Sequence, residues 1–480
     1  MKKTTTAVLL IAMLAACASC GDSGAAVETT AGAEESDTTA AVTELVPELP
    51  DKTFDGRTFT IYYREHSANR YAVDREAETG DVLDDAIFKR MRNVEEKLGM
   101  KFESVMTSGD STGDKAQNTM TAGDDAYQLV ASTFRTSAKF AAAGLCYDWD
   151  ELPWVDLSKP WWDVEVQDTI KLGSKRLVVL DTLSHDSLGA TKAMYFVKHF
   201  FDTFNVDYPY QLVRDGKWTF DKLSEYVKMF AQDVNGDTTM NIAGDNFGFI
   251  AQWWQQPMNI LATADQYIAE IKGGKLAMTL NSPRTTEVFE KYFKLMETDA
   301  YYMNPNDDTT AMYDAFYAGR GAFLESTLYF ADNARRMDAD FGIIPSPKFD
   351  DSVDGYPSLI DGGTNGLVVP AAVKDPEFVS AVLEALCYEN DRLVIPAYYN
   401  KVLQGKAVRD DDSIEMLDII RENRTCDAGY MYLASVSGGD KFANVGQALT
   451  AQSDHNFASY YASNEASAMT ALEEINSLYE

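Results

Sequence analysis

The chain has 480 residues, with 42 Lys and Arg against 75 Asp and Glu, which gives a formal net charge of −33 at pH 7. Apolar residues at 45% and aromatic residues at 12% are ordinary for a folded protein, so a wholly disordered chain is excluded. Proteins that bind nucleic acid or anionic membrane surfaces need a basic face, and this composition provides none. Small neutral ligands, cations and protein partners remain candidates.

The amino terminus predicts an export signal and a lipid anchor. Two lysines precede the apolar run 7–16, which is too short to span a bilayer core of about 30 Å. The run leads into Leu14–Cys17 (LAAC), which resembles the lipobox of bacterial lipoproteins. That resemblance implies a signal peptide over residues 1–16 and acylation of Cys17, whereas Cys20 lacks the upstream leucine. An ordinary secreted protein is the alternative.

Residues 17–51 predict a disordered, acidic tether. They contain no Lys, Arg or aromatic residue, so this stretch cannot offset the entropy lost on ordering. No later stretch has the sequence of a membrane span, so membrane contact is expected through the lipid alone. The remaining cysteines, Cys146, Cys387 and Cys426, lack metal-ligand or redox spacing, and a disulfide between two of them stays open.

The rest of the chain predicts alternating strands and helices. Strand 59–63 precedes a helix that carries apolar residues at 87, 91, 94 and 98 and ends at Gly99. Further strands are predicted at 101–105, 127–131, 176–180, 193–197, 247–250, 321–324 and 367–369. Further helices are predicted at 136–143, 220–231, 284–298, 375–390, 413–424 and in a last segment ending near 479. This order predicts an α/β protein with crossover helices, and its length favours two lobes.

Four blocks carry a family resemblance: Gly80–Ala86 (GDVLDDA), Asp156–Trp162 (DLSKPWW), Gly216–Leu223 (GKWTFDKL) and Phe341–Lys348 (FGIIPSPK). In this order they resemble the family 1 extracellular solute-binding proteins, which serve bacterial sugar ABC transporters. The blocks contain no catalytic group, and the lipobox fits the same family. The resemblance covers most of the chain from Phe54 onward.

The resemblance implies a two-lobed periplasmic-binding-protein-like α/β fold with a hinge and an interlobe cleft, in which closure captures the ligand. Chain crossings are expected near 180–185 and 359–364. Lobe one is then 52–183 plus 364–405, and lobe two is 184–363 plus 406–480.

The implied function is that of a lipid-anchored substrate-binding protein of an ABC importer, on the extracellular face of the cell membrane. It would pass a carbohydrate, expected to be an oligosaccharide, to permease subunits. The resemblance implies no turnover, no required cofactor and a monomer.

Aromatic residues are the main candidates for the binding site, because sugars present apolar faces together with hydroxyl edges. Trp253 and Trp254 follow strand 247–250 in a Gln-rich stretch. Adjacent residues on an extended segment point in opposite directions, so one of the two is expected to face the ligand. Tyr329 resembles the family's stacking aromatic at a strand-to-helix turn.

Polar candidates lie where predicted strands end or where the lobes should cross. Glu325, Arg135 and Asp361 are therefore expected to contact ligand hydroxyls, with solvated or ion-paired structural roles as the alternative. Trp161 and Trp162 are expected to plug the base of a lobe.

An oxygen-rich loop resembles the calcium loop found at this point in the family. Its candidate ligands are Asp233, Asn235, Asp237, Thr239 and Asp245. Thr238 stands where such a loop prefers Gly, and Asp245 lies one residue beyond the usual bidentate acid. A structural calcium ion and an Asx-rich turn both stay open.

A hydrolase is the alternative function. Gly109–Gly113 matches G-x-S-x-G with Ser111 as nucleophile, and His185, His199 and His455 follow it. The flanks of the motif are polar and acidic, whereas a nucleophile elbow needs a packed strand, so a surface loop is favoured. A surface-anchored hydrolase of glycans or esters is the second hypothesis, since acids are plentiful enough for a glycosidase pair.

Overall fold

The computed structural model describes residues 45–64, 74–107, 113–254, 256–304, 308–334, 337–403 and 411–480. The chain divides into units 1–45 and 46–480, and every element below belongs to the second. The predicted signal peptide, Cys17 and most of the predicted tether lie outside the described residues. Ser111 also lies outside them.

The first sheet has the strand order β2-β1-β3-β13-β4. Strand β1 runs parallel to β2 and β3, and β13 runs antiparallel to β3 and β4. Helices α2 and α3 connect the parallel strands; α2 was predicted from its apolar spacing, whereas α3 was not predicted. The bounds are β1 Thr58–Arg64, α2 Val82–Leu98, β2 Lys101–Thr107, α3 Asp114–Thr121, β3 Leu129–Thr133, β4 Val179–Leu180 and β13 Asn365–Val368.

Helix α2 shows how local sequence sets the bounds of an element. The Asp81 carboxylate accepts the backbone N–H groups of Leu83 and Asp84, which have no partner within the helix. Gly99 ends the helix with φ 60°, a left-handed conformation that favours glycine. A Cβ there would lie 2.8 Å from the Cβ of Thr53, so the close approach also requires glycine.

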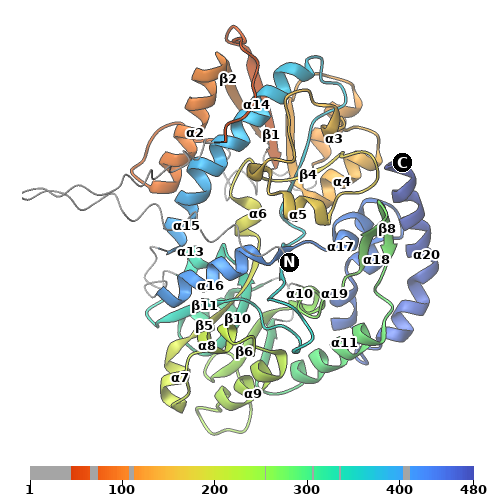
Figure 1. Cartoon of the computed structure of the whole chain (residues 1–480). Coiled ribbons are helices and arrows are strands. Elements are labelled where there is room, and N and C mark those ends of the chain that lie inside the picture. Colours follow the sequence, from red (N-terminus) through yellow and green to blue (C-terminus); the bar gives the residue numbers. More distant parts are fainter. Residues whose placement is uncertain are drawn as a thin grey trace, which may run out of the picture. The chain divides into compact units, whose positions relative to one another are not determined.

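Both faces of the first sheet are covered. Phe59, Ile61 and Tyr63 alternate along β1 and pack in one core with α2 and α14 (Pro376–Glu389), which run side by side in Figure 1. On the other face, Tyr62 packs in the core that includes α4 (Phe134–Ala142).

Trp161 and Trp162, in the 3₁₀ turn Pro160–Trp162, are buried against α14. Their indole N–H groups donate to Glu384 at 3.0 and 2.8 Å. Both indoles therefore have a structural role, as the sequence predicted.

The second sheet has the strand order β11-β5-β10-β6-β9. Strand β5 runs antiparallel to β10 and β11, while β10, β6 and β9 are parallel. The bounds are β5 Lys192–Val197, β6 Phe247–Gln252, β9 Tyr301–Asn304, β10 Gly321–Thr327 and β11 Phe341–Ile344, with the helices α7 Lys198–Phe204, α8 Tyr210–Arg214, α9 Phe220–Phe230, α12 Thr310–Tyr317 and α13 Phe330–Ala334.

The chain passes between the two sheets at two places that bear on function. It leaves the first sheet after β4 and enters the second at β5, through residues 181–191, here called the first passage. It returns from β11 to β13 through residues 345–364, the second passage. Later, α15 (Ile395–Leu403) contacts α2, whereas the next helix, α16 (Asp411–Glu422), contacts β11.

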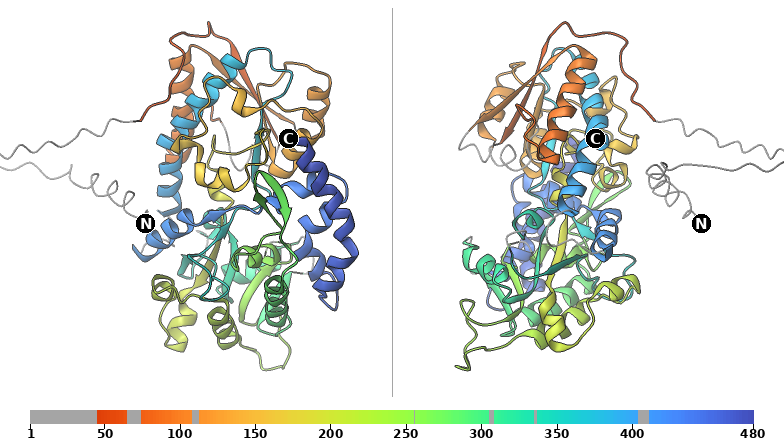
Figure 2. Two further views of the ribbon diagram at one scale, coloured as in Figure 1. Left: turned by 45° about the vertical axis from the view of Figure 1, so that its right-hand side comes forward. Right: turned by 90° about the vertical axis from the view of Figure 1, so that its left-hand side faces the viewer.

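The carboxy-terminal helices join neither sheet, but they contact elements associated with both. Helix α17 contacts α4, and α19 contacts α10. The helices at the carboxy terminus are the dark blue ones in Figure 2. The bounds are α10 Gln256–Ala262, β7 Ala269–Lys272, β8 Lys275–Met278, α11 Pro283–Met296, α17 Ala428–Tyr432, α18 Asp440–Ala443, α19 Val445–Thr450 and α20 Phe457–Leu478. The remaining short elements are the helical turns Trp149–Glu151, Asn390–Val394 and Leu433–Ser435, the helices α5 Val164–Thr169 and α6 Asp186–Gly189, and the strands β12 Ser358–Leu359 and β14 Arg424–Thr425.

Two further features of the described part are the state of its cysteines and the hydropathy of its helices. Cys146, Cys387 and Cys426 are free thiols, so the disulfide that the sequence left open is not formed among them. Burial raises the pKa of Cys426 to about 12 and also raises the pKa values of Cys146 and Cys387. Within the described ranges, we find no helix with both the length and the apolarity that a bilayer crossing requires.

Candidate functional site

The two passages meet at the short segment 189–191. The Leu328 and Tyr329 N–H groups donate to the carbonyls of Thr191 and Gly189 at 2.9 and 3.0 Å. On the other side, the Asp361 N–H donates to the Ala190 carbonyl at 3.1 Å. The segment therefore lies between the end of β10 and the second passage, and the side chains around it come from distant parts of the sequence.

A buried ion pair occupies this junction. Lys192 begins β5 with its side chain 1% exposed, and its Nζ lies 2.8 Å from Asp361 Oδ2. Burial would raise the pKa of Asp361, but the charge and hydrogen bond of Lys192, the Gly363 N–H and the charge of Arg135 lower it below its ordinary value. The Lys192 Nζ also lies 5.9 Å from the centroid of the Trp254 ring.

Arg135 lies on the first-sheet side of the same junction. It is the second residue of α4, directly after β3, and its guanidinium lies 5.4 Å from the Tyr430 ring. Its Nη1 donates to Asn444 Oδ1 at 3.0 Å. The Tyr430 ring packs on Gly362, where a Cβ would lie 2.7 Å from the ring, so the second passage needs glycine at this position.

Trp253 and Trp254 form the turn after β6, and both are half-buried. The Trp253 N–H donates to Asn304 Oδ1 at 3.0 Å, which fixes the start of the turn. The Trp254 carbonyl accepts from Gln447 Nε2 at 3.2 Å. The Trp254 ring lies beside Lys192.

Tyr329 follows β10 and packs on the first passage. Its ring packs on Gly189, where a Cβ would lie 2.2 Å away, and its side chain is buried. Its hydroxyl donates to Asp186 Oδ1 at 3.1 Å. Glu325 is buried in β10, where its Oε2 accepts from Asn259 Nδ2 at 2.9 Å and from the Ser346 hydroxyl at 3.0 Å.

The structure therefore brings Trp254, Asp361 and Arg135 to one junction. Tyr329 lies beside it, packed on the first passage, and Glu325 lies on β10 two residues before Thr327, the partner of Lys192. Sequence reasoning missed Lys192, Tyr430 and Asn444. A lysine at the start of the apolar strand Lys192–Val197 (KAMYFV) was a usable signal, because a buried lysine needs a partner. Tyr430 and Asn444 had no comparable signal.

Two buried carboxylates join the passages behind this junction. Asp186 accepts from the Thr364 hydroxyl at 2.9 Å and from the Asn365 N–H, while Asp181 accepts from Asn365 Nδ2 at 3.0 Å. Burial and the nearby Asp181 charge raise the pKa of Asp186 to about 7. Burial and the Arg90 charge lower the pKa of His185, next to Asp186, to about 3.

In the predicted calcium loop, the side-chain carboxylates accept hydrogen bonds from the backbone N–H groups of the loop itself. Asp233 accepts the Gly236 and Thr238 N–H groups at 2.8 and 2.7 Å, and Asp245 accepts those of Val234 and Asn241 at 2.9 and 2.7 Å. These are the contacts of an Asx-rich turn.

Thr238, at the place where glycine is preferred, has φ 69°. The Asn235 amide and the Thr239 N–H both donate to Asp237, at 2.9 and 2.8 Å. Across the described part of the chain, no three His, Cys, Asp or Glu side chains converge as a metal site would need.

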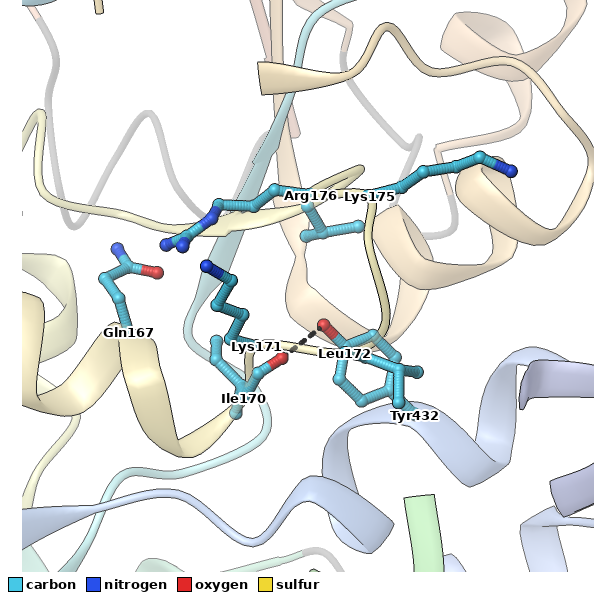
Figure 3. Close-up of a pocket in the computed structure, with 8 residues that line it drawn as sticks. Gln167, Ile170, Lys171, Leu172, Lys175, Arg176 and Tyr432 are labelled. Atoms are coloured by element: carbon cyan, nitrogen blue, oxygen red, sulfur yellow. Dashed lines mark hydrogen bonds between the residues drawn. The ribbon is translucent and has the colours of Figure 1, made fainter. Parts of the chain in front are cut away.

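Two hollows are lined by other residues. The one in Figure 3 is a narrow gap lined by Gln167, Ile170, Lys171, Leu172, Lys175, Arg176, Val178 and Tyr432. There the Tyr432 hydroxyl donates to the Ile170 carbonyl at 3.0 Å. The other, of about 350 Å³, lies beside the Asp233 loop and is lined by Lys228, Ala231, Asp233, Thr238, Met240, Asp299 and Ala300.

The three histidines that the hydrolase hypothesis used pack against different aromatic residues. His185 stacks on Tyr398 in the first passage, His199 stacks on Phe200, and His455 stacks on Phe293. Each ring thus has an aromatic packing partner.

Comparison with known proteins supports the fold. No protein-family model and no curated protein matches the chain. Similar solved structures include an ABC substrate-binding protein from Listeria monocytogenes in complex with cycloalternan (13% identity, 88% of this chain and 99% of that one, TM-score 0.53). The maltose/maltodextrin-binding domain MalE from Bdellovibrio bacteriovorus bound to maltotriose is another (16%, 87% and 99%, 0.53). UgpB from Mycobacterium tuberculosis in complex with glycerophosphocholine is a third (14%, 86% and 98%, 0.55).

At these identities the likeness concerns the fold. The two sheets and their helices have the two-lobed α/β architecture of solute-binding proteins, so the predicted fold class is confirmed.

Removing one member of the buried ion pair should destabilise the protein. We expect Asp361→Asn to lower the free energy of unfolding by about 3 kcal/mol, because the Lys192 ammonium loses its carboxylate in a buried site. The double variant Lys192→Met/Asp361→Asn should lose less than the sum of the two single variants. Urea unfolding at pH 7 measures both, and additive losses would contradict the coupling. Lys272→Met, which removes an exposed ion pair with Glu270, serves as the control.

Proposed function

We propose that this protein is a substrate-binding protein of an ABC importer, which captures a carbohydrate and delivers it unaltered to permease subunits in the membrane. One observation carries the proposal: Trp254, the Lys192–Asp361 pair and Arg135 meet where the chain passes between the two sheets. An aromatic ring beside charged and planar polar groups is the composition that a sugar site requires. The ligands named for the similar structures, cycloalternan and maltotriose among them, support an oligosaccharide.

The origin of these side chains suits capture by closure. Arg135 follows a strand of the first sheet, Lys192 begins a strand of the second, and Asp361 lies in the second passage. A ligand that contacts groups from both lobes binds the closed form more tightly, and it shifts an open–closed equilibrium by that difference in affinity. We keep the lobe bounds 52–183 plus 364–405 and 184–363 plus 406–480 as part of the proposal. A monomer is sufficient for this mechanism, and no chemical step is needed.

Ligand binding should depend on the tryptophan turn. We expect Trp253→Ala/Trp254→Ala to weaken binding by more than about 1 kcal/mol, because the sugar loses its aromatic platform. A thermal-shift screen of the full chain against neutral and acidic oligosaccharides identifies the ligand, and calorimetry then gives the affinities. Trp154→Ala, at a tryptophan packed on the first-sheet core, is the control. Unchanged affinity in the double variant, or release of a cleaved sugar, would contradict the proposal.

Lipid anchoring at Cys17 is the second part of the proposal, and the sequence alone supports it. In bacteria fed a labelled fatty acid, Cys17→Ser should abolish acylation and release the protein from the membrane, because the lipid would be its only membrane anchor. Cys20→Ser is the matched control and should keep both label and location. Label retained in Cys17→Ser would contradict the assignment.

Calcium binding by the loop of Asp233, Asn235, Asp237, Thr239 and Asp245 stays a prediction from its oxygen donors. If the loop holds calcium, EDTA lowers the melting temperature and added calcium restores it. Asp237→Ala should remove that response, whereas Asp265→Ala, at an acid outside the loop, should keep it. An unchanged melting temperature in EDTA would leave the Asx-rich turn as the whole account of this loop.

A further inference from the structure

Two fully buried carboxylates lie in the first passage, where the chain crosses between the sheets. Asp181 and Asp186 are 1% and 0% exposed. Asn365, the first residue of β13, donates to both of them, with its N–H to Asp186 Oδ2 and its Nδ2 to Asp181 Oδ2. Two carboxylates that share one partner in a buried site repel each other when both are charged, so such a pair favours keeping a proton.

Asp186 connects the two sheets. Its Oδ2 accepts from the Asn365 N–H and from the Thr364 hydroxyl at 2.9 Å, at the start of β13 in the first sheet. Its Oδ1 accepts from the Tyr329 hydroxyl at 3.1 Å, and Tyr329 follows β10 of the second sheet. One carboxyl group therefore bonds to a strand start in one sheet and to a strand end in the other.

The hydrogen bonds around Asp186 can accommodate a proton on Oδ1. The Tyr329 hydroxyl lies 3.1 Å from Oδ1 and 3.2 Å from the Asp186 carbonyl oxygen. A hydroxyl both donates and accepts. When Asp186 is charged, Tyr329 donates to Oδ1. When Oδ1 carries a proton, Oδ1 donates to Tyr329, whose own proton turns to the carbonyl oxygen. Both charge states of Asp186 thus keep their hydrogen bonds.

The donors around Asp181 favour its charged form. Its Oδ1 accepts from the Leu183 N–H at 2.9 Å, and its Oδ2 accepts from the Ser184 hydroxyl at 2.8 Å and from Asn365 Nδ2 at 3.0 Å. The N–H donors cannot accept a proton, and Ser184 itself accepts from the Asp186 N–H at 3.0 Å, which orients its hydroxyl toward Asp181. The proton of the pair therefore belongs on Asp186.

The charges around the pair act in opposite directions. Burial and the Asp181 charge raise the pKa of Asp186 well above its ordinary value, against two hydrogen bonds and the charge of Arg64. Burial lowers the pKa of His185 to about 3, so this ring is neutral near pH 7. The ionisable groups that act on the two carboxylates, or on His185 beside them, are Arg64 on β1, Arg75 and Arg90 before and on α2, Tyr329 after β10, Cys387 on α14, and Tyr398 and Lys401 on α15.

We infer that Asp186 is a pH-dependent link between the two sheets: with a proton on Oδ1 it holds the two passages together, and loss of that proton to solvent favours their separation. A charged carboxylate beside Asp181 gains hydration when the passages part, whereas the protonated form is fully hydrogen-bonded where it lies. The link requires no bound ligand, so it stands apart from the proposed function.

The packed junction is expected to be more stable at low pH. An acid whose pKa is higher in the packed junction than in water binds its proton more tightly there. The stabilisation is then complete below the ordinary pKa and is lost as the pH rises through the raised one. For Asp186 these two values are 3.8 and about 7.

Hydrogen exchange of the full chain tests the link. The Leu328 and Tyr329 N–H groups, which bond to the first passage, should exchange about ten-fold faster or more at pH 8 than at pH 5, after correction for the intrinsic rates. This additional acceleration should be absent in Asp186→Asn. The Gln232 and Asn246 N–H groups, which bond to each other's carbonyls outside the passages, are the internal control and should show no such acceleration.

Infrared titration locates the proton. The carboxyl band of Asp186 should disappear with a midpoint near pH 7, and Asp186→Asn should remove this band. Tyr329→Phe should raise the midpoint, because the charged form loses a charge-assisted hydrogen bond, which is stronger than the neutral one. Asp427→Asn, at a buried acid whose pKa is raised to about 6, is the matched control and should keep the Asp186 band.

Three results would overturn the inference. The first is the same pH-dependent exchange in Asp186→Asn as in the unmodified chain. The second is a carboxyl band with a midpoint near pH 7 that survives in Asp186→Asn, since the proton would then belong to another acid. The third, which remains available if Asp186→Asn does not fold, is an unchanged midpoint in Tyr329→Phe. Melting temperatures show whether each variant is folded.

Discussion

The constraint on which the structure depends is the packing of the first passage between two other segments. Residues 189–191 accept backbone hydrogen bonds from the end of β10 on one side and from Asp361 on the other. Gly189 and Gly362 allow the rings of Tyr329 and Tyr430 to lie directly on the two passages. A side chain at either glycine would push a buried ring away. The packing of this junction therefore requires glycine at both positions.

The charged groups at this junction are buried, and their burial costs desolvation free energy. A lysine at the start of a buried strand and two carboxylates behind it would destabilise the fold unless each had partners. Asp361 meets the lysine, and Asn365 serves both carboxylates, with its N–H for Asp186 and its amide for Asp181. Since Asn365 also begins β13, one residue couples the buried charges to the register of the first sheet. The same groups that bind a ligand in our proposal are therefore held by the elements that join the sheets.

Elements with strong local signals could be predicted from the sequence. Apolar spacing in 82–98, the Asp81 cap and Gly99 give the bounds of α2, and similar signals give α9, α11 and α14. Short helices such as α18 and α19 escaped prediction, because tertiary packing and not local preference determines them. The residues of the candidate site also fall into a predictable and an unpredictable group. Trp254, Asp361 and Arg135 could be nominated by type and position, whereas their meeting with Tyr430 and Asn444 depends on contacts between residues that are 69 to 309 positions apart.

The state of the cysteines has a practical consequence. Thiols react as thiolates, and the pKa values of the three thiols in the described body are raised, with Cys387 and Cys426 buried and Cys146 partly exposed. They would therefore resist maleimide dyes under conditions that modify an accessible thiol. In the body beyond residue 45, a single cysteine introduced on an exposed helix could carry a fluorophore without prior removal of Cys387 and Cys426, which would make this scaffold convertible into an optical sensor for the ligand of our proposal.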